Sequence, residues 1–125
     1  MKKILFIEDE EALQKTMNDI LKSAKYEVFS AMDGDSGIAI AKNKNPDLIL
    51  VDLILPKKNG FEVLQELKKD PVTKDIPVIV LTNLEGSLDV ERALALGATT
   101  YLVKANYSLQ DIVSKIEALF QHHSR

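Results

Sequence analysis

The chain contains 125 residues, carries a formal net charge of -3 and has no cysteine. Its length allows one domain with its own hydrophobic core, and 46% hydrophobic with 28% charged residues is the balance of a globular protein. The lack of cysteine excludes a disulfide framework and thiol chemistry, and the negative charge, with lysines and arginines scattered among acids, argues against direct binding to nucleic acid.

The first predicted strand is the apolar run Ile4–Ile7, which stops at the acidic pair Glu8-Asp9. Such a short run forms neither a signal peptide nor a membrane span, so we expect a cytoplasmic protein with no membrane partner. Helical spacing then predicts an amphipathic helix over residues 12–24. The residues on its inner face are Ala12, Leu13, Thr16, Met17, Ile20, Leu21 and Ala24.

Further runs of strand length alternate with stretches of helix length along the rest of the chain. A less regular helix is expected over residues 35–43, another over the region of Phe61–Leu67, and a third that ends just before Gly97. The strands between them are nearly all apolar, as expected for parallel strands covered on both faces. They are predicted at Val28–Ser30, Leu48–Val51, Val78–Leu81 and Thr100–Val103.

The last predicted helix covers residues 109–120, with Ser108 as its N-cap and Asp111 at the reciprocal capping-box position. Residues 121–125 form a polar tail that is expected to fray, and the pair His122-His123 in it is read as solvated, because adjacent helix positions do not face each other. The alternation predicts an α/β fold with five parallel strands wound in both directions as one domain over residues 1–125.

A polar group stands at the end of four of the five predicted strands: Glu8-Asp9, Asp52, Thr82 and Lys104. Each has an ordinary explanation as a turn residue, a helix-start acid or a solvated amine, but all of them meet at one edge of a parallel sheet. Three carboxylates together repel one another unless a cation joins them, and oxygen ligands favour Mg²⁺. A hydroxyl and an ammonium beside that metal suit a phosphoryl group.

The chain resembles the response-regulator receiver domains of two-component signalling, the CheY-like family, over essentially its whole length. The residues that carry the resemblance are Glu8, Asp9, Asp52, Pro56, Gly60, Thr82, Tyr101 and Lys104. The resemblance implies a flavodoxin-like sheet of order 2-1-3-4-5. It also implies a stand-alone receiver that a sensor histidine kinase or a phosphotransfer protein phosphorylates in the presence of Mg²⁺.

The resemblance also implies a role for each site residue. Asp52 would be the phosphoacceptor, with Asp9, Asp52 and the carbonyl of Ile54 as metal ligands and Glu8 acting through a metal-bound water. Thr82 and Lys104 would hold phosphoryl oxygens, and Thr82 and Tyr101 would form the switch. The activity implied is self-phosphorylation and self-dephosphorylation, with no conventional enzymatic turnover.

By the same resemblance, phosphorylation would change a protein-binding face. That face would bind a downstream protein or a second copy of the chain. Its residues would be Leu88, Arg92, Tyr101, Asn106 and Tyr107.

Three residues depart from the common receiver pattern. Glu8 stands where many members have a second aspartate, and Asn83 stands where a small residue is usual. Ala105 stands where proline is usual, so either the Lys104–Ala105 bond is trans or a strained loop carries Lys104, because a non-proline cis bond costs about 3 kcal/mol.

Three other functions compete with that of a receiver. A dehalogenase-like aspartyl phosphatase would need an acid two residues after Asp52, where Ile54 stands. A flavodoxin-like cofactor binder would need a phosphate loop after the first strand, where the acidic run Glu8–Glu11 would repel phosphate. A pseudo-receiver, an interaction module that is never phosphorylated, stays open as the alternative.

Overall fold

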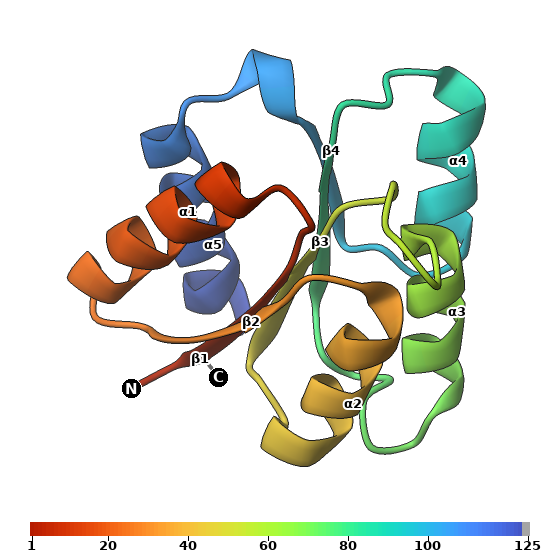
Figure 1. The fold of residues 1–125 in the computed structure, drawn as a ribbon, viewed down its shortest axis with the longest axis horizontal. Coiled ribbons are helices and arrows are strands. Elements are labelled where there is room, and N and C mark those ends of the chain that lie inside the picture. Colours follow the sequence, from red (N-terminus) through yellow and green to blue (C-terminus); the bar gives the residue numbers. More distant parts are fainter. Residues whose placement is uncertain (124–125) are drawn as a thin grey trace.

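The structure is a computed structural model that describes residues 1–123, and in it strands and helices alternate along the chain (Figure 1). The strands are β1 (Lys3–Ile7), β2 (Glu27–Ala31), β3 (Leu48–Val51), β4 (Val78–Thr82) and β5 (Thr100–Val103). The helices are α1 (Glu11–Ser23), α2 (Gly34–Lys44), α3 (Gly60–Lys69), α4 (Ser87–Ala95), the short 3-10 helix η1 (Lys104–Asn106) and α5 (Leu109–His123).

The strands form one parallel sheet in the order β2-β1-β3-β4-β5. Ile7 at the end of β1 is in register with Val51 of β3, and Val51 is in register with Val80 of β4. The carboxyl ends of the strands therefore lie along one edge of the sheet. This confirms the predicted five-stranded, flavodoxin-like α/β fold and its strand order.

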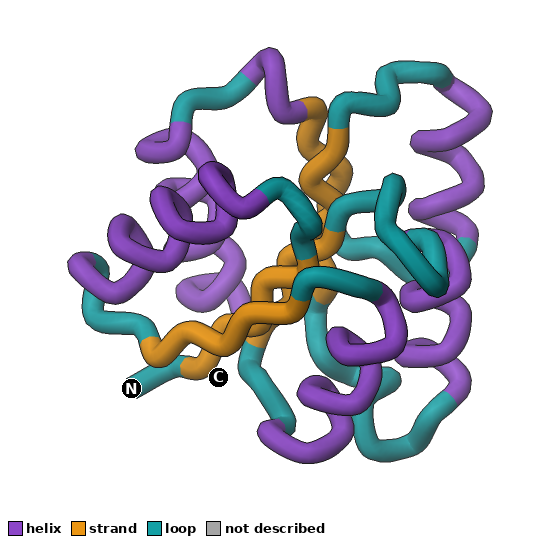
Figure 2. Tube along the Cα trace, in the orientation of Figure 1, coloured by secondary structure: helices purple, strands orange, loops and turns teal. Residues whose placement is uncertain are grey.

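Helices cover both faces of the sheet, which explains why the central strands are apolar throughout (Figure 2). On one face α2, α3 and α4 pack on a core that includes Leu5, Ile7 and Leu64. On the other face α1 and α5 pack on a second core that includes Phe6 and Ile116. Alternate residues of β1 thus belong to different cores, as the two-residue period of a strand requires.

Several element boundaries differ from those predicted. Thr82 is the last residue of β4 and does not follow it. The α2 helix begins at Gly34 and ends at Lys44, one residue beyond the predicted helix at each end. It begins there because the Asp33 side chain caps it and accepts a hydrogen bond from the Ser36 N–H at 2.8 Å, and it ends where Asn45 adopts a left-handed conformation with φ = 50°.

The C-terminal helix begins with the predicted capping box. The Asp111 N–H donates to Ser108 Oγ and the Ser108 N–H donates to Asp111 Oδ2, both at 3.1 Å. The helix runs to His123, so helical backbone extends into the segment predicted as a polar tail. Residues 124–125 of that segment lie outside the described residues.

The turns before and after β5 agree with the sequence. Gly97 follows α4 with φ = 109°, a backbone conformation that favours glycine, which confirms its predicted role in ending the helix. Residues 1–123 contain no cis peptide bond, so Lys104–Ala105 is trans, and Ala105 lies in η1.

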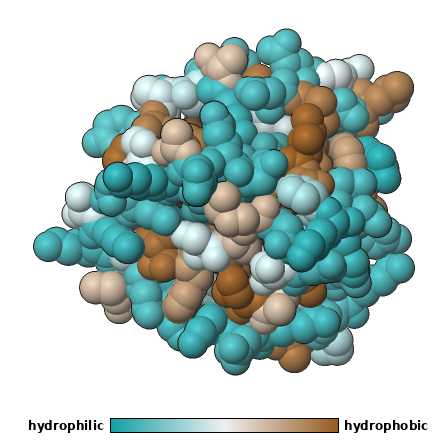
Figure 3. Space-filling view, in the orientation of Figure 1, coloured by the Kyte–Doolittle hydropathy of each residue, from teal (hydrophilic) through white to brown (hydrophobic). Residues whose placement is uncertain are grey.

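Hydrophilic side chains cover most of the face seen in Figure 3, and hydrophobic ones form small separate patches between them. Across the described part of the chain, none of the helices combines the length and the apolar character needed to cross a membrane.

Candidate active site

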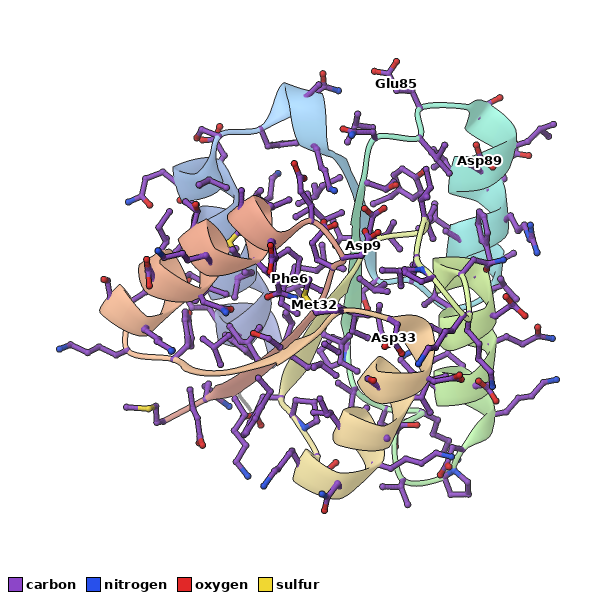
Figure 4. The ribbon with its side chains drawn as sticks, viewed as in Figure 1. Phe6, Asp9, Met32, Asp33, Glu85 and Asp89 are labelled. Atoms are coloured by element: carbon purple, nitrogen blue, oxygen red, sulfur yellow. The ribbon has the colours of Figure 1, made fainter. Side chains whose placement is uncertain are left out.

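Polar residues from four strands gather at the carboxyl edge of the sheet. Glu8 and Asp52 each lie one residue beyond a strand, and Thr82 ends β4. These three side chains are buried, whereas Asp9 is exposed where the chain leaves the sheet toward α1 (Figure 4). Two buried carboxylates at one edge require a cation near them, since an unpaired buried charge is costly.

Lys104 supplies that cation from the far side of β4. Its Nζ lies 2.8 Å from Asp52 Oδ2 and 2.7 Å from Glu8 Oε1, and the lysine side chain is only 15% exposed. One ammonium therefore bridges the two buried acids. The sequence grouped these three residues, but it did not predict the direct ion pair between Glu8 and Lys104.

The electrostatics of the bridge follow from burial and pairing. Burial raises the pKa of Glu8 above its usual value, and the charge of Asp52 raises it further, although Lys104 opposes both effects. Burial by itself would lower the pKa of Lys104, but its hydrogen bonds and charge interactions with Asp52 and Glu8 outweigh burial and raise it. Lys104 is thus firmly protonated in the folded protein.

The acids are also arranged as a possible metal site. One carboxylate oxygen from each of Glu8, Asp9 and Asp52 lies within 4.8 Å of the others. This donor set of oxygens alone fits a hard divalent cation such as Mg²⁺ or Mn²⁺. The cluster could therefore hold a divalent ion, with the exposed Asp9 on the open side.

The loop after β3 fixes the orientation of Asp52. The N–H of Ile54 donates to Asp52 Oδ1 at 3.2 Å, while the Ile54 side chain is 59% exposed. The loop returns to Gly60, where an added Cβ would lie only 2.4 Å from the carbonyl oxygen of Asp52. Only glycine allows α3 to start this close to the site, which accounts for Gly60 in the sequence motif.

The α3 start and the loop before it are built from residues of the same motif. Asn59 caps α3 in a reciprocal capping box with Glu62, with both hydrogen bonds at 3.0 Å. Lys57 has φ = 68°, a left-handed conformation that costs energy for a residue other than glycine. The capping box at the start of α3 therefore helps to hold the loop that orients Asp52, although Lys57 in that loop has a strained backbone.

Thr82 and Tyr101 meet at the loop after β4. The Leu84 N–H makes a long contact of 3.5 Å with Thr82 Oγ1, and the Tyr101 hydroxyl donates to the Leu84 carbonyl at 2.9 Å. Burial raises the pKa of Tyr101, and the charges of Asp89 and Asp52 add to this effect. Both predicted switch residues thus hold the same peptide segment, one at its N–H and one at its carbonyl.

The predicted output face is only partly free. Leu88 is 78% exposed on α4. The guanidinium of Arg92 lies 4.1 Å from the centre of the Phe61 ring on α3, so this residue is engaged with its neighbour helix. Lys115 Nζ lies 5.8 Å from the centre of the Tyr107 ring.

One residue at this edge escaped the sequence analysis. Gln14 of α1 is 4% exposed, and its Nε2 lies within hydrogen-bonding distance of the carbonyls of Phe6, Glu8 and Ala31. A usable signal was present, because Gln14 continues the buried stripe of Met17 and Leu21 at helical spacing. A polar residue on such a stripe has to find a hydrogen-bonding partner inside the protein.

Comparisons with known proteins agree with this geometry. The family model described as the response regulator receiver domain matches residues 4–117. The chain is 38% identical to the DNA-binding dual master transcriptional regulator RpaA of a Synechocystis species, over the whole of this chain and 52% of the relative. The chain therefore spans about half the length of that curated relative.

Two solved structures are similar over nearly their whole length. One is the Mn²⁺-bound form of the response regulator Rcp1, with 35% identity, a TM-score of 0.80, and coverage of 96% of this chain and 92% of the other. The second is the phosphorylated cyanobacterial phytochrome response regulator RcpA, with 32% identity, a TM-score of 0.79, and coverage of 96% and 91%. With its fold, its buried acidic pocket and the family match over residues 4–117, the chain belongs to the response regulator receiver domain family of two-component signalling, the CheY-like receivers.

Proposed function

We propose that this receiver accepts a phosphoryl group on Asp52 from a sensor histidine kinase or a phosphotransfer protein. The observation that carries the proposal is the ammonium of Lys104, which bridges Asp52 and Glu8 at 2.8 and 2.7 Å in a buried pocket. Such a pocket offers a carboxylate nucleophile and a fixed positive charge to a dianionic group. A structural ion pair alone would not need a third acid, Asp9, on its open side.

In the proposed reaction, an oxygen of Asp52 attacks the phosphorus of a phosphohistidine. The P–N bond breaks, its electron pair stays with the imidazole, and an acyl phosphate forms on Asp52. The Ile54 N–H holds Oδ1 of Asp52, so this hydrogen bond orients the nucleophile. Lys104 and Thr82 would hold phosphoryl oxygens and meet the charge that spreads over them during transfer.

The acidic cluster would hold Mg²⁺ through Asp9, Asp52 and the carbonyl of Ile54. When bound, the ion supplies charge neutralisation to the transferring phosphoryl group. We propose that Glu8 acts through a metal-bound water, because its Oε1 is already paired with Lys104 and its Oε2 accepts from the Glu10 N–H at 3.2 Å.

The output would be conformational. A phosphoryl group on Asp52 would draw the Thr82 hydroxyl toward it, and Leu84, which both Thr82 and Tyr101 contact, would move with the loop. Tyr101 would follow, because its hydroxyl holds the Leu84 carbonyl. The switch would therefore pass from the pocket to the surface through one peptide segment.

The surface that we propose as the output face contains Leu88, Tyr101, Asn106 and Tyr107, with Arg92 at its border with α3. It would bind a downstream protein or a second copy of the chain more tightly after phosphorylation, with a coupling of about 1–3 kcal/mol. The net charge of -3 supports a protein partner and not DNA as the direct target of this domain.

Fluoroberyllate, which mimics a phosphoryl group on aspartate, provides the test. With Mg²⁺ it should shift the backbone amide NMR signals around Asp52, through Leu84 and along the output face, and Asp52→Asn should abolish these shifts. If the shifts are absent in the wild type, the phosphoacceptor proposal fails and the pseudo-receiver alternative is favoured. If they stop at the pocket, the pocket accepts a phosphoryl mimic but the switch proposal fails.

A further inference from the structure

Gln14 joins three backbone segments at the acidic end of the sheet. Its Nε2 lies 2.9 Å from the carbonyl oxygen of Phe6, 3.2 Å from that of Glu8 and 3.1 Å from that of Ala31. Two N–H bonds thus serve three acceptors, one at the end of β2, one at Phe6 in β1 and one at Glu8, just beyond β1. The side chain comes from α1, so it ties this helix to the ends of two neighbouring strands.

The carbonyl of Glu8 is the most informative of these acceptors, because it belongs to the peptide that joins Glu8 to Asp9. The other polar atoms of Glu8 are also held. Its N–H donates to the Ala31 carbonyl at 2.9 Å, Oε1 pairs with Lys104, and Oε2 accepts from the Glu10 N–H. Gln14 therefore completes the set of contacts that holds Glu8 and the peptide leading to Asp9.

Packing alone does not require an amide here. Gln14 lies on the buried stripe that Met17 and Leu21 continue along α1, where an apolar side chain would bury more favourably. The amide is useful because β2 ends at Ala31, so the sheet provides no further strand residue to pair with the Glu8 carbonyl. A side chain from α1 takes over that pairing at the point where the acids begin.

From this geometry we infer that Gln14 is a positioning residue of the metal site, holding the Glu8–Asp9 peptide in the conformation that binds a divalent cation. The inference rests on the proposed function, since it concerns the ion that phosphorylation would use. Hydrogen-bonding partners outside the set of ligands commonly change metal affinity by about 10- to 100-fold. We expect a change near the lower limit, because Gln14 acts on the backbone and not on a ligand side chain.

The test compares two buried hydrogen bonds at opposite edges of the sheet. Gln14→Met keeps the length of the side chain and removes the donor. The matched control is Thr73→Val, because Thr73 is 0% exposed and its hydroxyl donates to the Leu67 carbonyl at 2.7 Å, far from the acids. For each protein, Mg²⁺ affinity is measured by calorimetry and stability by urea unfolding in chelator.

We expect both substitutions to lower the urea midpoint, but only Gln14→Met to weaken Mg²⁺ binding, by about tenfold. Thr73→Val should bind Mg²⁺ within a factor of about two of the wild type. If Gln14→Met is destabilised with unchanged Mg²⁺ affinity, the residue is only structural and the inference is wrong. If the wild type binds Mg²⁺ but Asp52→Asn is still phosphorylated, the proposed function fails independently of Gln14.

A measurement on the wild type covers the case in which Gln14→Met does not fold. Asn18 also lies on α1, and its amide donates to Ser30 Oγ at 2.8 Å, away from the β1–α1 loop. On Mg²⁺ addition, the side-chain NH₂ signals of Gln14 should shift and those of Asn18 should stay in place. Equal shifts, or no shift at Gln14, would contradict the inference. If the wild type binds no Mg²⁺, the proposed function and the inference fail together.

Discussion

The two edges of the sheet use polar residues in opposite ways. At the amino edge several polar side chains bond the backbone. Asp47 accepts from the N–H of Lys3, the first residue of β1, at 2.7 Å, and Lys68 donates to the carbonyls of Lys74 and Ile76 in the loop before β4 at 3.1 and 2.7 Å. At the carboxyl edge the charges of Glu8, Asp52 and Lys104 face one another. One edge closes the fold, and the other keeps charges available for a ligand.

Substitutions at the amino edge should therefore affect stability, and substitutions at the carboxyl edge should affect function. At the amino edge, removing a polar group leaves a backbone partner unpaired, which destabilises the protein. At the carboxyl edge, removing a charge changes the balance among charges that face one another, so it should affect the proposed chemistry first. Substitutions at the two edges can therefore test this separation.

The largest effect is expected for Asp52→Asn, which keeps the shape of the side chain but removes the nucleophile. Incubation with acetyl phosphate and Mg²⁺ should phosphorylate the wild type and leave the variant unlabelled in intact-mass spectra, with the fold retained in circular dichroism. A stoichiometric phosphate on the variant would place the acceptor at another residue. The carboxyl edge would then not be the site of phosphorylation.

The second prediction concerns the lifetime of the acyl phosphate. Ile54 and Leu84 stand two residues after Asp52 and Thr82, and neither side chain can hydrogen-bond the water that attacks the phosphorus. We expect slow self-dephosphorylation, and the double variant Ile54→Asn, Leu84→Glu should lose radiolabel faster, by up to about 10²-fold.

The control for this experiment lies at the other end of the molecule. Val72 is 57% exposed, nearly as much as Ile54 at 59%, but it lies in the loop that follows α3. Val72→Asn should leave the lifetime unchanged. A double variant that decays no faster than its parent would show that these two positions do not control the attacking water.

The third prediction concerns the amino edge alone. Thr73→Val removes the donor to the Leu67 carbonyl and should lower the free energy of unfolding by about 1–2 kcal/mol in urea denaturation. The initial rate of labelling by acetyl phosphate should stay at the wild-type value. A loss of labelling in a folded Thr73→Val protein would mean that the two edges are coupled. The separation between stability at one edge and function at the other would then be wrong.

The smallest expected effect is a change in the free energy of unfolding that has opposite signs at the two edges. Asp9→Ala should lose Mg²⁺ binding and gain up to about 1 kcal/mol of stability in chelator, because it removes a like charge from the exposed side of the pocket. Asp47→Ala, which also removes an exposed acid, should instead lose stability with its hydrogen bond to the Lys3 N–H. Urea unfolding of both variants in chelator measures the difference, and equal signs would argue against a crowded acidic pocket.

The sequence predicted the fold correctly, and the same signal marked the candidate site residues. Apolar runs such as Leu48–Val51 stop abruptly at a charged residue, so the strand end and the candidate site residue are read together. What it could not predict depends on side-chain length and direction in three dimensions. The sequence places Glu8 and Lys104 at one end of the sheet, but it does not indicate that their side chains form an ion pair. It also gives no sign that Arg92 lies on Phe61 of α3.

Gln14 falls between these two cases. The helical spacing indicates its position on the buried stripe of α1, but a glutamine among charged neighbours is more typical of the exposed surface of a helix. Only the position of the strand ends reveals what its amide would meet. The predicted start of α2 was wrong for a similar reason. The cap at Asp33 uses a side-chain hydrogen bond, which the spacing of apolar residues does not indicate.

The bridge through Lys104 has a consequence for how the protein is made. The lysine follows the edge strand β5, and its partner Asp52 lies 52 residues earlier in the chain. At a synthesis rate of about 5–20 residues per second, Lys104 is added roughly 3–10 s after Asp52. During that interval the nascent chain carries the acids without their counter-ion. Closing so long a loop costs conformational entropy, so we expect the bridge to form late in folding. An ion pair between Asp52 and Lys104 would then indicate that the chain has folded.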